Sequence, residues 1–183
     1  MQVKTVDSWN EELCKQVSRI YEQAFAGKGA KPEKILRNMF RKKLCFLHVG
    51  FIEDEVVAMA ITGELKGIEA LLIDYLAVDE GFQHRGIGLQ MVEMIKDWCL
   101  SDGRFNGMVI ETEADMTPDN LARIQFWKKC GFTITDYVHH YIWVPETYRA
   151  MFVKLVSDSV LPDNGEQVFR FIGMFHKASY QGA

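Results

Sequence analysis

The stretch QHRGIG, residues 83–88, lies between two segments whose patterns differ. The run before it, ALLIDYLAVD (70–79), is almost continuously apolar, as expected for a strand buried on both faces. The run after it, LQMVEMIKDWC (89–99), spaces its apolar residues as an amphipathic helix does. Glycine allows positive φ and close backbone approach, and the first N–H groups of a helix attract anions. The stretch therefore predicts a strand–turn–helix unit that binds an anion, usually a phosphate.

The two common phosphate-binding loops do not fit this turn. A Walker loop needs GxxxxGK[ST], which the sequence lacks, and a dinucleotide fingerprint needs a third glycine where Met91 stands. An isolated GxG is also found in tight turns with no ligand. The position of this one, between a buried strand and a helix N-terminus, favours a binding role.

The other segments alternate between strand and helix patterns in the order β-α-α-β-β-β-α-β-α-β-β. Ser8 and Glu11 match the S-x-x-E pattern of a helix N-terminus, and Pro32 and Pro118 fit first helical turns. Turns are predicted at Glu53–Asp54 and at Pro145–Glu146. The second of these would join the runs 132–144 and 148–156 into a hairpin.

The length of 183 residues, 48% of them hydrophobic, suits one packed domain. We expect a domain over residues 1–157 and a C-terminal extension, 158–183, packed on that same domain. The extension contains the amphipathic run VFRFIGMF (168–175). This run is predicted to pack on the sheet, with a homodimer contact as the alternative.

Composition also limits the partners. The net charge of −4 gives no broad basic face, so we expect no nucleic acid partner. The cysteines form no CxxC pair and suggest free thiols in a reducing compartment. No apolar run approaches the roughly 20 residues that span a bilayer, and the N-terminus does not resemble a targeting peptide. We therefore expect a cytoplasmic protein without a membrane partner. No metal is expected either, because neighbours such as His139 and His140 in a strand face opposite ways.

The turn also fits the motif Q/R-x-x-G-x-G/A, and on this ground the chain resembles the GNAT superfamily of acyl-CoA-dependent N-acyltransferases. Leu76-Ala77-Val78 matches the L-x-V strand end of that family. Asn120 and FWKKCGF (126–132) match its later helix motif, and the order of elements agrees over residues 1–157. The resemblance implies an α/β fold with a mixed, mostly antiparallel seven-stranded sheet. It also implies helices on both faces and a splay between the fourth and fifth strands.

The resemblance implies acetyl-CoA as co-substrate. The backbone of Arg85–Gly88 would hold the pyrophosphate, Gln83 would brace the loop, and the backbone of Leu76–Val78 would pair with the pantetheine arm. Asn120 would contact the pantetheine or the phosphate end. The implied cofactor-binding residues are Leu76, Ala77, Val78, Gln83, His84, Arg85, Gly86, Ile87, Gly88, Asn120 and Trp127.

Two carboxylates are candidates for the general base. Glu111, in the strand VIET, matches a position where some members of the family carry a catalytic glutamate. Asp74 is the only charged residue inside the central strand, where burial disfavours its charged form. Each also has a structural interpretation: Glu111 as an exposed or ion-paired carboxylate, and Asp74 as a buried aspartate held by hydrogen bonds. A water chain is a third route for the proton.

The sequence departs from the family at the proton donor. Many members carry a tyrosine four residues before the GF pair, but here Trp127 stands there, and an indole N–H is not a proton source. Trp127 packs either on the cofactor or in the core. Tyr75, Tyr137 and Tyr141 remain as alternative donors.

These features predict an N-acetyltransferase that moves an acetyl group from acetyl-CoA directly to a primary amine of a small molecule or peptide. The alternative is a non-catalytic acyl-CoA-binding sensor or regulatory module, which Trp127 favours. The sequence does not identify the acceptor amine.

Overall fold

A computed structural model describes residues 1–27 and 29–182 of the chain. Its residues form two compact units. The first unit comprises residues 1–63, 74–95 and 175–182, and the second comprises residues 64–73 and 96–174. Several helices and strands therefore begin in one unit and end in the other.

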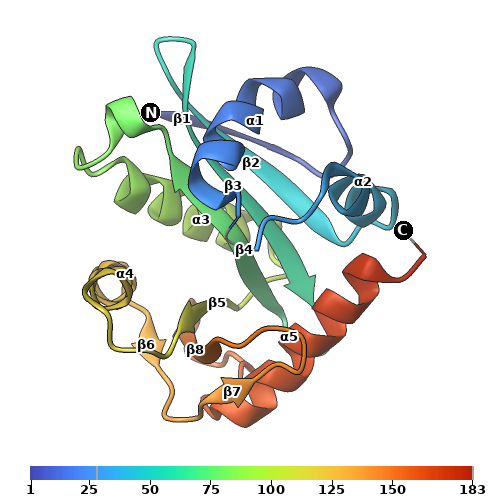
Figure 1. Cartoon of the computed structure of the whole chain (residues 1–183), viewed down its shortest axis with the longest axis vertical. Coiled ribbons are helices and arrows are strands. Elements are labelled where there is room, and N and C mark those ends of the chain that lie inside the picture. Colours follow the sequence, from blue (N-terminus) through green and yellow to red (C-terminus); the bar gives the residue numbers. More distant parts are fainter. Residues whose placement is uncertain (28, 183) are drawn as a thin grey trace. The chain divides into compact units, whose positions relative to one another are not determined.

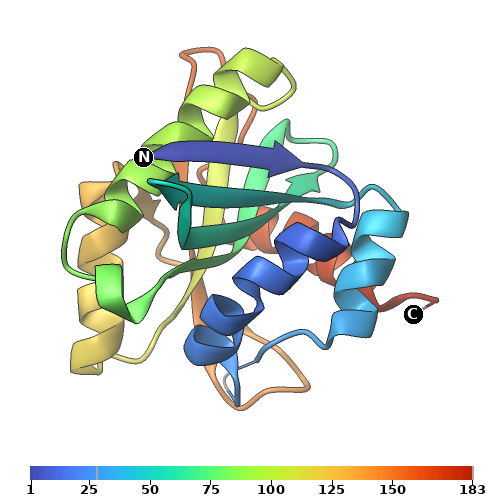
Figure 2. The ribbon, with the colours of Figure 1, turned by 90° about the horizontal axis from the view of Figure 1, so that it is seen from above.

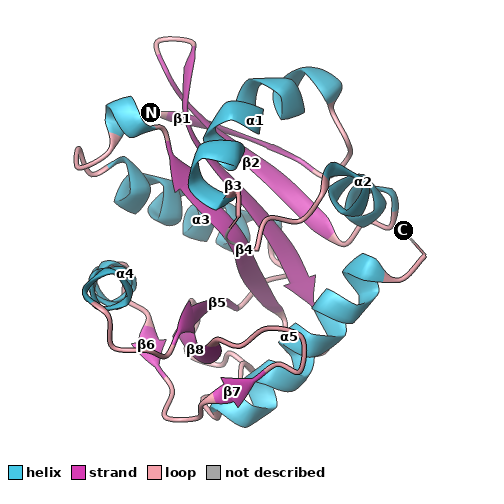
Figure 3. Ribbon diagram, viewed as in Figure 1, coloured by secondary structure: helices cyan, strands magenta, loops and turns pink. Residues whose placement is uncertain are grey.

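The strands form a mixed sheet with the order β1-β2-β3-β4-β5-β8-β6, in which β7 also pairs with β8 (Figures 1 and 3). The strands are β1 Gln2–Val6, β2 Cys45–Ile52, β3 Glu55–Leu65, β4 Ala70–Val78, β5 Gly107–Glu113, β6 Thr133–Ile134, β7 His139–His140 and β8 Thr147–Lys154. In the second unit β4 and β5 are parallel, and β8 is antiparallel to β5, β6 and β7. The predicted mixed, mostly antiparallel sheet is confirmed, and the splay between the fourth and fifth strands stays a prediction.

The sheet has eight strands among the described residues, not the predicted seven. The predicted hairpin arm 132–144 is divided into the two short strands β6 and β7. The division falls at Thr135, whose N–H and hydroxyl both donate to the carbonyl of Ala150, at 2.9 and 3.0 Å. The chain bends at the next residue, and pairing with β8 resumes only at His139.

Five α-helices accompany the strands in the described part of the chain: α1 Glu11–Phe25, α2 Glu33–Arg41, α3 Ile87–Asp102, α4 Pro118–Lys129 and α5 Gly165–Tyr180. The predicted cap of α1 by Ser8 and Glu11 is wrong. Asn10 is the N-cap, and its side chain accepts a hydrogen bond from the Leu13 N–H at 2.9 Å. Asparagine is as good an N-cap as serine, so the helix begins after Asn10 rather than after Ser8. Within the described residues, no helix has the length and apolarity needed to cross a membrane.

The first unit has helices on both faces of its strands. Figure 2 shows α1 and α2 on one side of β1–β3 and the first part of α3 on the other. Gly50 of β2 lies under α3, where a Cβ would come within 3.4 Å of the Met91 sulfur. On the opposite face α1 buries Leu13, Val17 and Ile20 at helical spacing. The predicted arrangement of helices on both faces is therefore confirmed here.

The C-terminal helix contributes to both units. In the second unit Phe169 is buried against the ring of His139. In the first unit the end of α5 is tied to α2, because Asn38 donates to the Ser179 carbonyl at 2.8 Å and Lys42 donates to the Ala178 carbonyl at 3.0 Å. These contacts supply partners for the carbonyls at the end of a helix. The boundary proposed between residues 157 and 158 stays a prediction.

The first unit also buries a histidine completely. His48 of β2 is 0% exposed, and its two ring nitrogens lie 2.8 Å from the hydroxyls of Thr5 and Thr62. Burial lowers the pKa of His48 from 6.5 to about 3. The imidazole is therefore neutral in the folded protein near neutral pH.

This histidine should make the protein sensitive to acid. Between pH 6.5 and about 3 the unfolded chain binds a proton that folded His48 does not. The free energy of unfolding should therefore fall by about 1.4 kcal/mol for each pH unit below 6.5, and should be unaffected by this group above 6.5. We expect His48→Gln, measured by urea unfolding at several pH values, to show a shallower decline. The exposed His140→Gln is the control, and equal slopes for both variants would contradict the prediction.

Candidate functional site

The predicted phosphate turn joins β4 to α3 in the first unit. After β4 the chain forms a short 3-10 helix, Glu80–Phe82, and then turns through two left-handed residues, His84 (φ 61°) and Gly86 (φ 77°). The Gly86 carbonyl accepts the Gln90 N–H at 3.0 Å, so Gly86 immediately precedes α3 rather than lying within its first turn. The N–H groups at the start of α3 come before this first helical hydrogen bond and are directed along the helix axis toward the turn.

The turn has the properties that an anion site needs. Residues 83–86 are exposed, and a Cβ built on Gly86 would meet no atom within 4 Å. The backbone is therefore accessible, and left-handed residues in a turn bring N–H groups into a concave arrangement. The helix dipole adds partial positive charge at the same place. A pyrophosphate group fits these features.

Side chains hold the turn from both ends of its 3-10 helix. Gln83 donates to the Val78 carbonyl at 3.1 Å, which braces the turn against the end of β4. The buried Asp79 accepts the Gly81 N–H at 2.9 Å and pairs with Arg19 of α1 at 2.5 Å. The turn is thus fastened to both β4 and α1. Leu76 and Val78, predicted to offer their backbone to pantetheine, are half-buried near this end of β4, with Ala77 buried between them.

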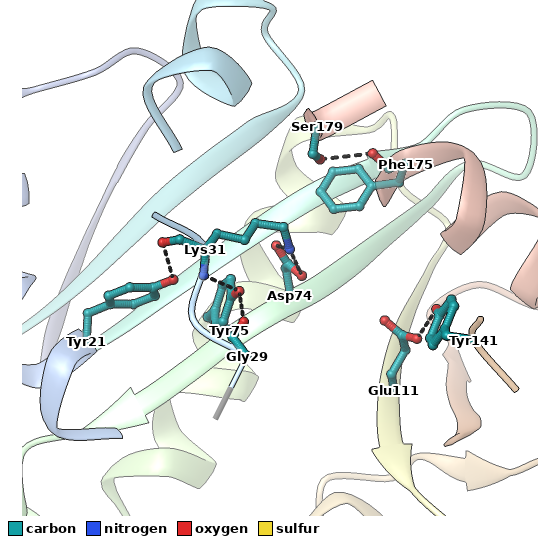
Figure 4. Close-up of polar contacts among 9 residues, drawn as sticks. All are labelled: Tyr21, Gly29, Lys31, Asp74, Tyr75, Glu111, Tyr141, Phe175 and Ser179. Carbon is teal, nitrogen blue, oxygen red and sulfur yellow. Dashed lines mark hydrogen bonds and ion pairs between the residues drawn. The ribbon is translucent and has the colours of Figure 1, made fainter. Parts of the chain in front are cut away.

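Asp74, one candidate for the general base, is already neutralised. Its two carboxylate oxygens accept hydrogen bonds from the Lys31 ammonium at 2.8 and 2.7 Å (Figure 4). Both side chains are only 5% exposed. A proton bound by this carboxylate would leave the buried lysine charge unpaired, so the pair disfavours Asp74 as a base.

The same pair fixes the segment between α1 and α2. The Tyr75 hydroxyl accepts the Lys31 N–H and donates to the Gly29 carbonyl, both at 3.0 Å. The Tyr21 hydroxyl donates to the Lys31 carbonyl at 3.1 Å. Burial, followed by the nearby Asp74 charge, raises the pKa of Tyr75. A phenol held in this way is a poor source of protons, which weakens Tyr75 as a candidate acid.

Glu111, the other candidate base, lies on β5 in the second unit, next to Ile110, which pairs with Ile73 of β4. Its side chain is half-buried, and its Oε1 accepts a hydrogen bond from the Tyr141 hydroxyl at 2.5 Å (Figure 4). In this contact the donor to Glu111 is a neutral phenol. A carboxylate accepts several hydrogen bonds, so this contact is compatible with proton transfer from an amine or a water.

Aromatic rings surround the Glu111–Tyr141 contact. The Tyr141 ring stacks on Trp143 at 5.0 Å between centroids and meets Tyr148 and His139 edge-on. His139 in turn stacks on Phe169 at 4.3 Å. Burial lowers the pKa of His139, although the Glu111 charge partly opposes this, so the ring is neutral at neutral pH.

The two remaining predicted cofactor residues have structural contacts in the second unit. Asn120 is buried and donates to the Asp115 carbonyl at 3.1 Å, which ties the loop before α4. Trp127 is 9% exposed and packs edge-on against Phe126 and Phe132 at 5.0 and 5.2 Å. Trp127 therefore belongs to the core, and contacts of these two residues with a cofactor stay predictions.

Sequence reasoning missed three partners in these sites. Lys31 lies in a loop and pairs with Asp74, and Arg19 lies on the surface of α1 and pairs with Asp79. The only sequence signal for either cation was the aspartate itself, which needs a partner when it is buried. Tyr141 was named as a possible acid, but its contact with Glu111 spans 30 positions of the chain. No local pattern encodes a contact across that distance.

Residues 11–132 match the model of the acetyltransferase (GNAT) family. A solved protein from Bacteroides thetaiotaomicron, assigned to the same family, is 15% identical with a TM-score of 0.72 and covers 97% of this chain and 95% of its own. An aminoglycoside 6'-N-acetyltransferase solved with coenzyme A is 16% identical with a TM-score of 0.67, over 85% of this chain and 98% of its own. The ribosomal-protein-S18-alanine N-acetyltransferase of Escherichia coli is 18% identical with a TM-score of 0.61, over 86% and 97%. At these identities the likeness to solved structures establishes the fold, and no curated protein matches the chain.

The buried pair of Lys31 and Asp74 yields a test by stability. Lys31→Met should cost about 3–5 kcal/mol in urea unfolding, because it leaves a buried carboxylate without its cation. The double variant Lys31→Met/Asp74→Leu should recover most of that loss, since an apolar pair can replace a buried ion pair. Glu166→Gln, which breaks the exposed Arg170–Glu166 pair, serves as the control and should lie within experimental error of wild type. If Lys31→Met were as stable as Glu166→Gln, the interpretation of Lys31 and Asp74 as a buried ion pair would be wrong.

Proposed function

Because this chain belongs to the GNAT acetyltransferase family, we propose that it transfers an acetyl group from acetyl-CoA directly to the primary amine of a small molecule or peptide. The observation that carries the proposal is the turn at Gly86. Its left-handed backbone, its exposure and its position at the N-terminus of α3 together suit a pyrophosphate. Support also comes from a solved neighbour, the aminoglycoside acetyltransferase, whose structure contains coenzyme A.

The turn and the end of β4 would hold the co-substrate. The backbone of Arg85, Gly86, Ile87 and Gly88 would bind the pyrophosphate, while Gln83 and Asp79 keep the turn in place through their observed contacts. The backbone of Leu76–Val78 would bind the pantetheine arm. His84 would contribute through its left-handed backbone. Bound acetyl-CoA would supply the acetyl group as an activated thioester.

Glu111 would act as the general base. A primary amine is an ammonium at neutral pH and must lose a proton before its nitrogen can accept the acetyl group. Glu111 can take that proton directly or through a water, because a carboxylate that accepts the Tyr141 hydroxyl at Oε1 has further lone pairs. Asp74 is the weaker candidate, since the Lys31 ammonium occupies both of its oxygens. Tyr141 orients the Glu111 carboxylate by donating to Oε1.

A proton for the leaving thiolate would come from a group other than Trp127. The indole is buried among aromatic rings, and its N–H can donate a hydrogen bond but is not acidic enough to release its proton. Of the three tyrosines considered, Tyr75 is committed to backbone contacts with Gly29 and Lys31. Tyr141 is the better candidate, because its hydroxyl lies beside the proposed base and donates a hydrogen bond to it.

The replacement of the family's usual tyrosine by Trp127 favours a second candidate function, a non-catalytic acyl-CoA sensor. Binding of acetyl-CoA without turnover on any amine would support that alternative. For the compartment we propose the cytoplasm, since none of the four cysteines forms a disulfide. The homodimer contact through residues 168–175 has less support, because Val168, Phe169, Ile172 and Phe175 are buried within one chain.

The first test concerns the turn. Acetyl-CoA at about 100 times its Kd should stabilise the wild type by about 2.7 kcal/mol. Gly86→Val should abolish most of this shift, because the side chain would fill the space where the anion approaches the backbone. Gly103 is a matched control, with φ 78° against 77° and equally open surroundings. Gly103→Val should therefore show the same backbone strain with a normal acetyl-CoA shift, and equal shifts in both variants would place the anion elsewhere.

The second test concerns Glu111. Glu111→Gln keeps size and hydrogen bonding but removes basicity, so kcat/KM should fall about 10²- to 10⁴-fold. The loss should shrink as pH rises, because more of the amine arrives deprotonated, and acetyl-CoA affinity should hardly change. The control is Glu55→Gln, which removes an exposed carboxylate at the start of β3. Parallel pH–rate profiles for wild type and Glu111→Gln would clear Glu111 of the role.

A further inference from the structure

The loop after β7 exposes an unusual amount of apolar surface. Ile142 is 96% exposed and Trp143 is 66% exposed. Trp143 is not isolated, because its ring stacks on Tyr141, which in turn meets Tyr148. We name the rings of Tyr141, Trp143 and Tyr148 the aromatic platform. Its innermost ring, Tyr141, carries the hydroxyl that donates to Glu111.

The charges near the aromatic platform are mainly negative. Glu113 lies opposite Tyr148 in the β5–β8 ladder, Glu146 precedes Tyr148 by two residues, and Glu111 accepts the Tyr141 hydroxyl. Arg123 offsets part of this charge through a contact with Glu113 at 3.6 Å. An acceptor that carries its own carboxylate would be repelled here, whereas an ammonium would be attracted.

The composition of the surface also discriminates among amines. Exposed indole and phenol faces favour a flat or apolar body by stacking and burial, and they offer few hydrogen-bond partners to a polyhydroxylated one. A cation next to an aromatic face gains further attraction. The two features meet at Tyr141, whose ring belongs to the platform and whose hydroxyl contacts the proposed base.

We propose that the acceptor is a primary amine with an aromatic or apolar body and no carboxylate, whose body stacks on the aromatic platform while its ammonium faces Glu111. This inference rests on the proposed function, since it names the acceptor of the same reaction. Proton transfer to Glu111 leaves the nitrogen lone pair to accept the acetyl group. The nitrogen–carbon bond forms as the carbon–sulfur bond of the thioester breaks, and the second proton lost by the nitrogen passes to the thiolate, so coenzyme A leaves as its thiol.

The experiment uses the full chain, acetyl-CoA and a thiol-release assay with five amines. 2-Phenylethylamine is the probe that fits the proposal. Phenylalanine adds a carboxylate to the same body, and ethylamine removes the body. Glucosamine tests a polyhydroxylated acceptor, and 1,5-diaminopentane tests a second cation. We expect kcat/KM for 2-phenylethylamine to exceed that of each other amine by about tenfold or more, which is the effect of one good stacking contact with its buried area.

Variants of the platform then locate the preference. Trp143→Ala should raise KM for 2-phenylethylamine about tenfold, a much larger change than for ethylamine, which has no ring to stack. Trp143→Phe, which keeps a ring, should recover most of the affinity. Tyr180→Ala removes an exposed aromatic ring of similar exposure, 52%, outside the platform and should change neither KM.

The possible failures can be told apart. Equal or better turnover of any of the other four amines overturns the acceptor class, although the acetyltransferase activity would stand. A preference for 2-phenylethylamine that survives Trp143→Ala overturns the role of the platform. Binding of acetyl-CoA, seen as a thermal shift, with no turnover of any amine overturns the proposed function and this inference together.

Discussion

A single charged residue in the middle of β4 constrains the whole first unit. Asp74 lies in a strand that is otherwise apolar, and a carboxylate taken out of water without a partner is very costly. Lys31 supplies the partner, but it can do so only if the segment between α1 and α2 is brought down onto β4. Tyr21 and Tyr75 hold the backbone of that segment with three further hydrogen bonds. The position of the α1–α2 connection is thus set by one buried charge.

The same constraint separates the roles of the two strand carboxylates. Asp74 and Glu111 each follow a residue of the β4–β5 ladder, Ile73 and Ile110, yet they have partners of different chemistry. Asp74 is bound by an ammonium on both oxygens, whereas Glu111 is bound by a phenol. An ammonium stabilises the ionised carboxylate far more than a phenol does. The buried pair with Lys31 therefore explains Asp74 as a structural residue, and Glu111 stays the proposed general base.

The turn at Gly86 shows the complementary case, in which local chemistry is sufficient. The anion binding that we propose for it needs a left-handed glycine, a helix N-terminus and an exposed backbone. All three are encoded within a few adjacent residues. Tertiary contacts refine it, since Asp79 connects the turn to Arg19 of α1.

Local pattern alone predicted the parts of this protein that depend on short-range physics. The buried strand before Gly86, the helix after it, the start of α4 at Pro118 and the turn at Glu53–Asp54 all follow from the spacing and conformational preferences of adjacent residues. The family could be identified for the same reason, because its motif is a local turn. Local pattern misjudged the cap of α1, where Asn10 competed with Ser8, and the arm 132–144, where Thr135 contacts the distant Ala150.

Tertiary structure alone decided which side chains meet. Lys31 reaches Asp74 across 43 positions and Tyr141 reaches Glu111 across 30, and neither contact leaves a periodic signal in the chain. Pairing of this kind is set by the cost of burying a charge or a polar group, which depends on where the strands and loops come together. The sequence thus determined that an exposed glycine turn precedes α3 and that β4 carries an aspartate. The fold determined that the aspartate would be neutralised and that the glutamate would be presented beside an aromatic surface.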